Sequence, residues 1–348
     1  MKNPEKIYII LVNYNGWKDT IECLESILHN NYKYYQIIVC DNASTDDSLN
    51  YIKQWAEGKH IPEVDPEHPL THLLMPIKEK PLQYSTYSYE SLLHHTAPQP
   101  LSDSPLILID AGSNLGFAGG NNAAIKFAQL KNDFTHVWIL NNDTVIENDS
   151  LEQLVKYAHQ SRESGNKTGI IGSKLLYYNN PDVIQAVGGI YYRTLAYSRH
   201  IGSGEYDKGQ FDNENFKKDY VIGASLFVSK EYINDVGPMC EDYFIYFEET
   251  DWITRGNKRG WKIGYTGKSR VYHKEGASTG ANKQKKTKSS FAVYHFFRSA
   301  LIFTWSHYPL LLMIVIPRIL ATILYRILKG DKDKVNAMIT ALTLKKMY

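Results

Sequence analysis

The first part of the chain alternates between short apolar runs and stretches with helical periodicity. Ile7–Val12 is an unbroken apolar run of strand length, and residues 17–28 then carry apolar side chains at helical spacing. Gln36–Cys40 repeats the strand pattern, and Ser44 or Thr45 is expected to cap the helix that follows it. This βαβα order predicts a parallel sheet that binds its ligands at the carboxyl ends of its strands.

The alternation is interrupted between about residues 58 and 105, where Pro, His, Tyr and Ser are frequent and periodicity is weak. We interpret this segment as an insertion in a surface loop. Beyond it, strands or strand ends are expected at Leu106–Asp110, Val137–Leu140, Gly169–Ser173, Tyr220–Val228, Phe244–Asp251 and Trp261–Tyr265, and helices at Asn121–Gln129, at Ser150–Ser161 and from Phe291 onward.

Composition and charge add a second feature, a basic C-terminal segment on an acidic body. The 348 residues are 43% hydrophobic and 22% charged, which suits a globular protein with a sizeable core. Residues 283–348 contain 12 Lys or Arg against two Asp, so this segment carries +10 and the first 282 residues carry −8 of the total of +2. Such a tail is expected to meet an anionic surface. Phospholipid is favoured over nucleic acid, because no aromatic–basic stacking surface accompanies the charge.

The cysteines and the N-terminus bear on the compartment. Cys23, Cys40 and Cys240 are odd in number and lack metal-ligand spacing, which is typical of free thiols in a reducing compartment. The apolar run Ile7–Val12 is too short for the hydrophobic region of a secretory signal. We therefore expect a cytoplasmic body.

Two predicted strand ends carry side chains suited to a nucleotide and a metal ion. Asp143, preceded by Asn141 and Asn142, could hold a divalent cation through oxygen ligands, although Asn-Asp pairs are also common in turns. Asp41 could bind a base or ribose. The glycine-containing run Asn114–Asn122 could let the backbone approach a nucleotide, or it could be a tight turn before a helix.

Two further segments have candidate acid–base or ligand groups. Phe247–Trp252 contains Glu248, Glu249 and Asp251, and such crowding raises the pKa of at least one carboxyl group, as a general base near neutral pH requires. A solvated acidic turn is the alternative. His273 could be a metal ligand, although a lone histidine is more often structural.

Together these segments resemble the family 2 glycosyltransferases, and within them the bacterial rhamnosyltransferase-like branch of surface polysaccharide synthesis. They occur in the order of that family and extend over residues 7 to about 300. The matching segments are Val12–Asn15, Cys40–Asp46, Asn114–Asn122, Leu140–Thr144, Phe247–Trp252 and His273–Ser278.

The resemblance implies a GT-A fold, an α/β fold with one Rossmann-like nucleotide-binding domain around a mixed central sheet. It implies Glu249 as the catalytic base, and Asp143 and His273 as ligands of Mg²⁺ or Mn²⁺. Asn141 stands where the family's fuller metal motif has an acidic residue, and Glu249 replaces the commoner Asp. The nucleotide contacts implied are Val12, Asn13, Tyr14, Asp41, Asn114, Gly119, Asn122, Asn141 and Asn142, and the further site candidates are Glu248, Asp251, Trp252 and Arg298.

The implied function is inverting, metal-dependent transfer of a sugar from dTDP-rhamnose or a UDP-sugar to an acceptor hydroxyl, on a lipid-linked or surface saccharide. A nucleotidyltransferase is the first alternative, but the loop after Val12 lacks a glycine-rich, basic phosphate-binding sequence. A nucleotide-sugar-binding module without activity is the second, against which the presence of Asp143, Glu249 and His273 together argues.

The predicted organisation is a glycosyltransferase domain over residues 1–290 and a helical C-terminal extension over residues 291–348. Residues from about Pro309 to Leu328 are almost long enough to cross a bilayer, but Pro317, Arg318 and Arg326 interrupt the apolar run. An interfacial helix on the inner face of the membrane is favoured, with packing against the body or a homo-oligomer contact as alternatives. The basic loop Lys283–Lys288 is either a solvated loop or a flap over the donor phosphates.

Overall fold

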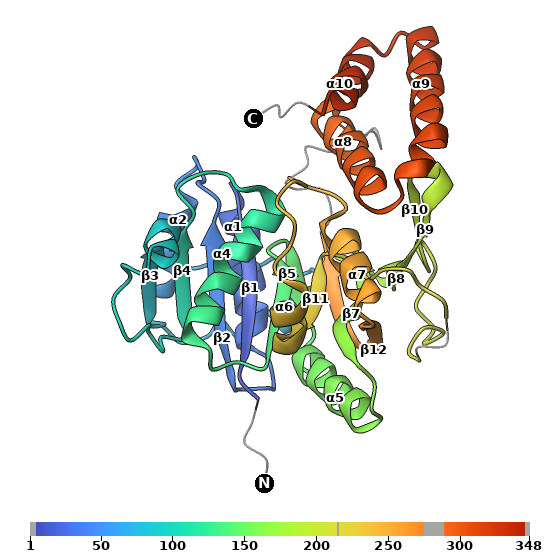
Figure 1. The fold of residues 1–348 in the computed structure, drawn as a ribbon. Helices are drawn as coiled ribbons and strands as arrows, with labels where there is room; N and C mark the ends of the chain where they lie inside the picture. Colours follow the sequence, from blue (N-terminus) through green and yellow to red (C-terminus); the bar gives the residue numbers. More distant parts are fainter. Residues whose placement is uncertain (1–4, 214–215, 275–288, 345–348) are drawn as a thin grey trace.

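The central element is a ten-stranded mixed sheet (Figure 1). The computed structural model describes residues 5–213, 216–274 and 289–344. The strands of this sheet are β1 (Ile7–Asn13), β2 (Tyr35–Asp41), β3 (Tyr84–Ser88), β4 (Leu106–Asp110), β5 (His136–Asn141), β6 (Thr144–Ile146), β7 (Thr168–Tyr177), β8 (Asn180–Ala186), β11 (Ser225–Ser229) and β12 (Lys262–His273). A separate pair consists of β9 (Gly189–Tyr192) and β10 (Tyr197–His200).

The strand order is β3-β4-β2-β1-β5-β11-β7-β12-β6, with β8 paired to β7. The first five strands are parallel, β11 runs antiparallel to both of its neighbours, and β12 is parallel to β7. The sheet is therefore mixed, as the resemblance implied. The parallel half follows from the βαβα pattern of the sequence.

Helices cover both faces of the sheet. The α-helices are α1 (Trp17–Leu28), α2 (Ser48–Ala56), α3 (Tyr89–Leu93), α4 (Gly116–Lys131), α5 (Ser150–Glu163), α6 (Lys230–Val236), α7 (Glu248–Lys258), α8 (Ser290–His307), α9 (Leu312–Leu328) and α10 (Lys332–Leu342), and the short 3₁₀ turns are η1 (Thr71–Leu73), η2 (Arg193–Leu195) and η3 (Pro309–Leu311).

Side-chain alternation along β1 shows how the layers form. Ile7, Ile9 and Leu11 belong to the core beneath α1, α2 and α5, whereas Tyr8 and Ile10 belong to the core beneath α4, α6 and α7. Because successive side chains of a strand point to opposite faces, an apolar run without polar interruption requires cover on both sides. The continuous apolar run in the sequence is thus explained by a three-layer arrangement.

The interpretation of residues 58–105 as an insertion in a surface loop does not hold for their second half, which joins the sheet. Residues 84–88 form β3, which pairs in parallel with β4 and makes one edge of the sheet. Leu92, Ala97 and Leu101 then enter the core beneath α4. This strand could not be recognised in the sequence because an edge strand buries few side chains and therefore needs no regular apolar pattern. In β3 only Tyr87 is buried.

Two local predictions were also wrong. Phe244–Asp251 contains no strand: it is a turn that leads into α7, whose first turn holds three carboxylates where the helix dipole favours negative charge. Neither Ser44 nor Thr45 caps α2, which begins after Asp47 in a left-handed conformation (φ 62°). The Ser44 hydroxyl instead donates a hydrogen bond to Asp41.

The C-terminal extension consists of α8, α9 and α10, with α10 packed back on α8. Figure 1 shows these helices, in red, as a separate group that adjoins the sheet domain beside β9 and β10. The Ser299 hydroxyl of α8 donates to the Ile245 carbonyl (3.1 Å), and Arg298 donates to the Asp242 carbonyl (2.7 Å). The extension is therefore tied to the turn that precedes α7, and the predicted boundary at residue 290 stays a prediction.

A pair of adjacent leucines tests whether the second half of the insertion is part of the core. Leu92 is fully buried and Leu93 is 45% exposed. We expect Leu92→Ala to lower the free energy of unfolding by about 2–5 kcal/mol, because it leaves a cavity beneath α4. Leu93→Ala should change it by less than about 1 kcal/mol. Chemical denaturation of both variants measures this, and equal effects would contradict the placement of this segment.

Candidate active site

The strand register brings the predicted nucleotide-binding side chains to one edge of the sheet. Asn13 of β1 lies opposite Asp41 of β2, and Val12 lies opposite Asn141 of β5. The next strand on the other side of β2 ends at Asp110, which is opposite Asp41. These four strands are parallel, so their carboxyl ends form the edge at which ligands bind in open α/β sheets.

Buried hydrogen bonds connect three of these residues. The Asn13 amide donates to Asp41 Oδ1 (2.6 Å) and to the Ser44 hydroxyl (3.0 Å). The Thr20 hydroxyl donates to Asn13 Oδ1 (2.8 Å) and accepts from the Asn142 amide (2.9 Å). Asn13, Asp41 and Asn142 therefore form one network through Thr20. Thr20 was not predicted, although its helical spacing with Leu24 and Ile27 puts a hydroxyl on the apolar face of α1, a signal that could have identified it.

Asp143 and His273 converge at the end of β12, as the predicted metal pair requires. His273 Nε2 lies 3.1 Å from Asp143 Oδ1 and 3.2 Å from the Asn141 amide nitrogen. His273 Nδ1 lies 2.8 Å from Gln185 Oε1, an acceptor, so Nδ1 carries a proton and Nε2 is the atom turned toward Asp143. Gln185 thus fixes the ring as an outer partner does in metal sites, and it was not predicted.

The local electrostatics keep Asp143 ionised. Burial opposes its charge, but the adjacent His273 and Lys274 outweigh burial and lower the pKa of the Asp143 carboxyl. Lys274 is held in place by Asp19 and Glu22 of α1.

The donor set fits a divalent cation that is completed by its substrate. The Asp143 carboxylate oxygen and the His273 Nε2 atom lie 3.1 Å apart, and both can act as electron-pair donors. Either a proton between them or a cation bound to both stabilises this arrangement. Within residues 5–213, 216–274 and 289–344, no group of three or more His, Cys, Asp or Glu is clustered for a metal. Asp143 and His273 would therefore leave positions for water and phosphate oxygens, as is usual for Mg²⁺.

Glu248 and Glu249 begin α7 after a strained turn. Tyr246 (φ 71°) and Phe247 (φ 74°) are consecutive residues in the left-handed region, which costs on the order of 1–3 kcal/mol for each and is concentrated at functional sites. Burial raises the pKa of Glu249 to about 7. Burial and the neighbouring Glu249 raise the pKa of Glu248 well above its usual range. The pKa of Glu249 is thus suited to proton exchange near neutral pH.

A backbone segment connects Glu249 with the metal pair. The Glu249 carboxyl group lies close enough to Gly223 that a Cβ there would be 3.7 Å from Glu249 Cδ. The next residue, Ala224, accepts a hydrogen bond from the Asn141 amide of the backbone (3.0 Å). Glu249 and the Asn141–Asp143 segment therefore lie on the two sides of the turn that precedes β11.

The glycine-containing run Asn114–Asn122 packs tightly against the turn before α7 and against the end of β1. A Cβ at Gly116 (φ 70°) would lie 2.4 Å from the Phe244 carbonyl oxygen, and one at Gly120 would lie 2.7 Å from Val12 Cγ1. The Asn122 amide donates to the Met239 carbonyl (2.9 Å) and to Glu241 (2.7 Å). These contacts explain Asn122 without a nucleotide, so its predicted contact with the donor stays a prediction.

The remaining candidates divide by exposure. Tyr14 is 40% exposed beside Asn13, and the Asn114 side chain accepts from the Gly116 amide of the backbone (3.0 Å). Gly119 lies in α4, where a Cβ would meet the Leu115 side chain at 2.6 Å. Three further candidates are buried and have partners within the protein. Asp251 binds His307 (2.6 Å) and Arg255 (2.7 Å). Trp252 donates to the Gly237 carbonyl (2.8 Å), and Arg298 donates to the Asp242 carbonyl. The basic loop Lys283–Lys288 and residues 275–278 lie outside the described residues.

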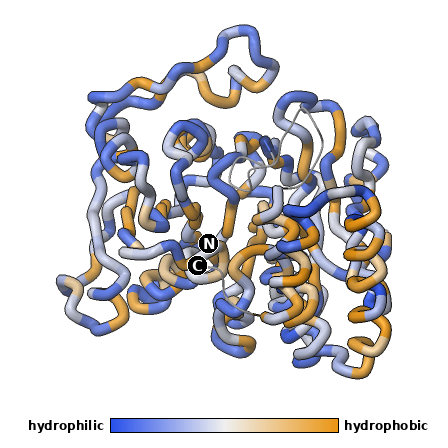
Figure 2. The backbone as a smooth tube through the Cα atoms, turned by 90° about the horizontal axis from the view of Figure 1, so that it is seen from above, coloured by the Kyte–Doolittle hydropathy of each residue, from blue (hydrophilic) through white to orange (hydrophobic). Residues whose placement is uncertain are grey.

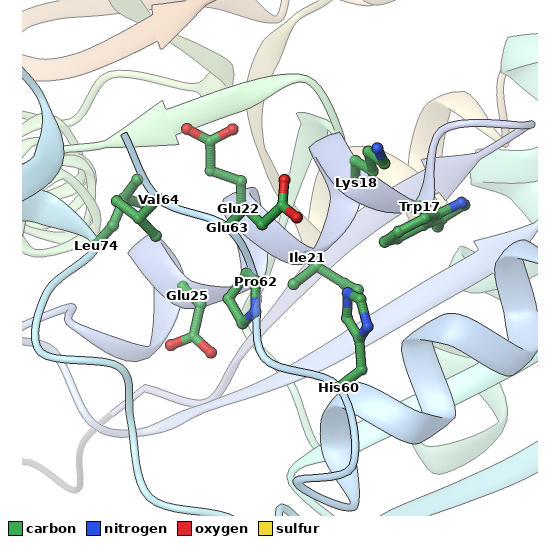
Figure 3. Close-up of a pocket in the computed structure, with 10 residues that line it drawn as sticks. All are labelled: Trp17, Lys18, Ile21, Glu22, Glu25, His60, Pro62, Glu63, Val64 and Leu74. Carbon is green, nitrogen blue, oxygen red and sulfur yellow. The ribbon is translucent and has the colours of Figure 1, made fainter. Parts of the chain in front are cut away.

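A separate pocket of about 160 Å³ lies between α1 and the first half of the insertion (Figure 3). Trp17, Glu22 and Glu25 of α1 form one wall, and His60 and Val64 form another. None of the predicted site residues lines it. Glu25 is engaged by Lys80 (2.9 Å) and by the Trp55 indole (2.7 Å), which tie α1 to α2 and to the insertion beside this pocket.

Comparison with known proteins agrees with this arrangement. The sequence profile described as Glycosyl transferase family 2 matches residues 8–66 and 85–237. The low-salt glycan biosynthesis hexosyltransferase Agl10 of Haloferax volcanii is 24% identical over 196 residues, a match that covers 56% of this chain and 58% of that protein. The chain thus spans little more than half the length of that relative.

Solved structures give the fold. The Pyrobaculum calidifontis mannosyltransferase PcManGT, in complex with GDP-Man and Mn²⁺, superposes with a TM-score of 0.51 at 14% identity, over 98% of this chain and 87% of that one. S. aureus TarS 1–349, in complex with UDP-GlcNAc, gives 0.53 at 14% identity, over 97% and 81%. The predicted GT-A-like α/β fold with a mixed sheet is confirmed.

Replacement of Asp143 tests the metal pair. The thermal-unfolding midpoint of the unaltered protein should rise with UDP, dTDP or GDP, and part of this rise should require Mn²⁺. Asp143→Asn should abolish the Mn²⁺-dependent part, because the amide offers the cation no negative charge. Asp149→Asn, a matched change in the residue before α5, should retain it. A full Mn²⁺-dependent rise in Asp143→Asn would exclude Asp143 as a ligand.

Proposed function

The chain belongs to glycosyl transferase family 2, and on that basis we propose that it is an inverting, metal-dependent glycosyltransferase. It moves a sugar from a nucleotide-diphosphate donor to an acceptor hydroxyl. The observation that carries the proposal is the position of Glu249, a carboxyl group with a pKa of about 7, across one turn from the Asp143–His273 pair. This arrangement supports a general base on one side of the site and a diphosphate-binding pair on the other.

The donor side is formed by the strand ends. Asn13 and Asp41, fixed by their mutual hydrogen bond, contact the nucleoside, together with Val12 and Tyr14 beside them. Asp143 and His273 hold Mg²⁺ or Mn²⁺, and Asn141 and Asn142 flank this pair. When bound, the cation offsets the negative charge that develops on the leaving diphosphate. Lys274, fixed by Asp19 and Glu22, adds positive charge beside Asp143.

The acceptor side is formed by α7. Glu249 removes the proton of the acceptor hydroxyl as that oxygen attacks the anomeric carbon and the bond to the diphosphate breaks. A base with a pKa near the working pH is efficient in this role, because it is largely ionised and still basic enough to take the proton. One displacement inverts the anomeric configuration, and no protein nucleophile is needed.

The identity of the substrates is a finer part of the proposal. The resemblance to rhamnosyltransferases favours dTDP-rhamnose, with a UDP-sugar as the alternative donor. The hexosyltransferase name of Agl10 supports a hexose-type sugar in general. The acceptor is proposed to be a growing saccharide, lipid-linked or at the cell surface, assembled at the cytoplasmic face of the membrane.

Glu249→Gln tests the catalytic base. The substitution keeps the shape of the side chain and removes its basicity, so the rate of sugar transfer should fall by about 10²–10⁴. Donor binding, measured as the Mn²⁺-dependent thermal shift with nucleotide, should stay unchanged. Glu248→Gln is the matched control, because burial and the neighbouring Glu249 raise the pKa of Glu248 well above its usual range and disfavour its ionised form. Its rate should stay within about threefold of the unaltered rate. The reverse ranking of the two variants would assign the base to Glu248.

The pH dependence gives an independent test. Because the pKa of Glu249 is raised to about 7, the base is ionised above this pH and protonated below it. At saturating Mn²⁺, kcat/KM should therefore fall about tenfold per pH unit below pH 7 and level off above it. Glu248→Gln should keep this acidic limb. A profile that stays flat down to pH 5.5 would show that no group with this pKa acts as the base.

A further inference from the structure

The exposed apolar side chains of the molecule are concentrated on the C-terminal extension. The structure describes one segment that is long and apolar enough to cross a membrane, Pro309–Leu328, and 17% of its most apolar stretch is buried. Figure 2 shows hydrophobic residues along this outer helix. The large apolar residues exposed on or next to α9 are Leu310 (82%), Met313 (81%), Ile314 (49%), Ile316 (38%), Leu320 (51%), Leu324 (59%), Tyr325 (57%), Ile327 (53%) and Leu328 (79%).

Helical geometry places these residues on one broad face. Val315, Ile319 and Ile323, spaced by four residues, are the buried residues of α9 and form a narrow inner stripe. The exposed apolar residues cover about half of the circumference, and Arg318 and Thr322 lie in the remaining sector between them and the inner stripe. A flat protein partner would cover only part of so broad a face, whereas lipid can surround all of it.

The two arginines of α9 do not interrupt this outer face. The Arg318 guanidinium donates to the Leu195 carbonyl in η2, and the Arg326 guanidinium binds Asp331 (2.7 Å) before α10. Both side chains thus have partners within the protein, Arg318 to one side of the buried stripe and Arg326 in line with it. Within residues 312–328, all of which the structure describes, Arg318 and Arg326 are the charged residues, and neither lies within the arc of exposed apolar side chains. Of the three residues expected to interrupt the apolar run, the two arginines therefore lie outside this face, whereas Pro317 is exposed on it.

The inner contacts argue that α9 lies along a membrane and does not cross it. Beyond α9 the chain returns, and Val335, Met338 and Ala341 of α10 are buried where α10 packs on α8. A spanning α9 would have to leave its inner stripe and carry α10 away from α8. Residues 289–344 hold six Lys or Arg and two Asp, so this part of the chain is basic, and Lys329 and Lys332 are exposed just after the helix. Positive charge beside an apolar face complements an anionic lipid surface.

We propose that the outer face of α9 docks on the surface of an anionic phospholipid bilayer, with the helix axis in the membrane plane. The apolar side chains from Leu310 to Leu328 enter the boundary between headgroups and acyl chains, and the neighbouring lysines contact the headgroups. Trp305, 69% exposed in the last turn of α8, has the amphipathic ring that is enriched at this depth.

Through α8, the extension that carries α9 is attached to the acceptor side of the proposed site. The inner side of α8 holds the turn before α7 through Asp242 and Ile245, and Phe244 in that turn contacts Gly116 at the strand ends. Docking does not depend on sugar transfer. It gives the proposed reaction a reason to use an acceptor that is attached to a lipid.

Vesicle flotation tests the docking directly. The full chain, without nucleotide sugar, is mixed with vesicles of phosphatidylglycerol and phosphatidylcholine in equal amounts, or with phosphatidylcholine alone. The unaltered protein should float with the anionic vesicles and more weakly with the neutral ones. The double variant Leu320→Glu and Leu324→Glu should lower the partition coefficient at least tenfold, because both side chains lie on the outer face.

The matched control is Ile61→Glu with Leu93→Glu, which adds the same charge at exposed apolar positions (73% and 45%) far from α9 in the sequence. It should float like the unaltered protein. Circular dichroism and the nucleotide-dependent thermal shift should be unchanged in both variants, so a loss of docking is separable from a loss of fold or donor binding. Flotation of the α9 variant at the unaltered level would overturn the proposal. A second outcome would also overturn the proposal. The unaltered protein would bind no vesicles and would be a dimer in light scattering, and the α9 variant would be a monomer.

Discussion

The register of four parallel strands is the constraint on which the rest of the site depends. Because β1 pairs with β2 and β5 in one fixed register, Asn13, Asp41 and Asn141 end at the same edge of the sheet. A slip of one residue would turn the apolar side chains of β1 to the opposite face, and both cores would lose their contacts. The cores therefore fix the register, and the register fixes the polar network. The position of Thr20, which joins Asn13 to Asn142, follows from the packing of α1 on the same strands.

A second constraint holds the base. Tyr246 and Phe247 adopt a left-handed conformation that is unfavourable unless surrounding contacts enforce it. The Phe247 ring is packed against Phe303 (5.4 Å between ring centroids) and Phe296 (5.9 Å) of α8. The extension therefore supplies the contacts that stabilise the turn before Glu249. It is part of the structural support of the site, in addition to any role at a membrane.

Sequence patterns predicted what local periodicity and family motifs encode. The run Ile7–Val12 and the helix over residues 17–28 were located almost to the residue, and Asp143 and His273 do converge. What could not be predicted depends on contacts that are distant in sequence. The edge strand β3 buries too little to show an apolar pattern, and Gln185 lies 88 residues from the histidine ring that it orients. The left-handed turn before Glu249 is formed by Tyr246 and Phe247, so no glycine in the sequence indicates a positive φ there.

The outer helix of the extension, α9, is linked to the aromatic cluster around Phe247. Arg318, turned away from the outer face of α9, donates to Leu195 in η2. The strand just before η2 contains Tyr191, whose ring contacts Phe247 (5.6 Å) and Phe303 (5.2 Å) edge to face. This hydrogen bond thus ties α9 to the segment that carries Tyr191 and, through it, to the aromatic cluster around Phe247. Displacement of α9 from the body would break this bond and loosen the cluster, and the strained turn before Glu249 would lose part of its support.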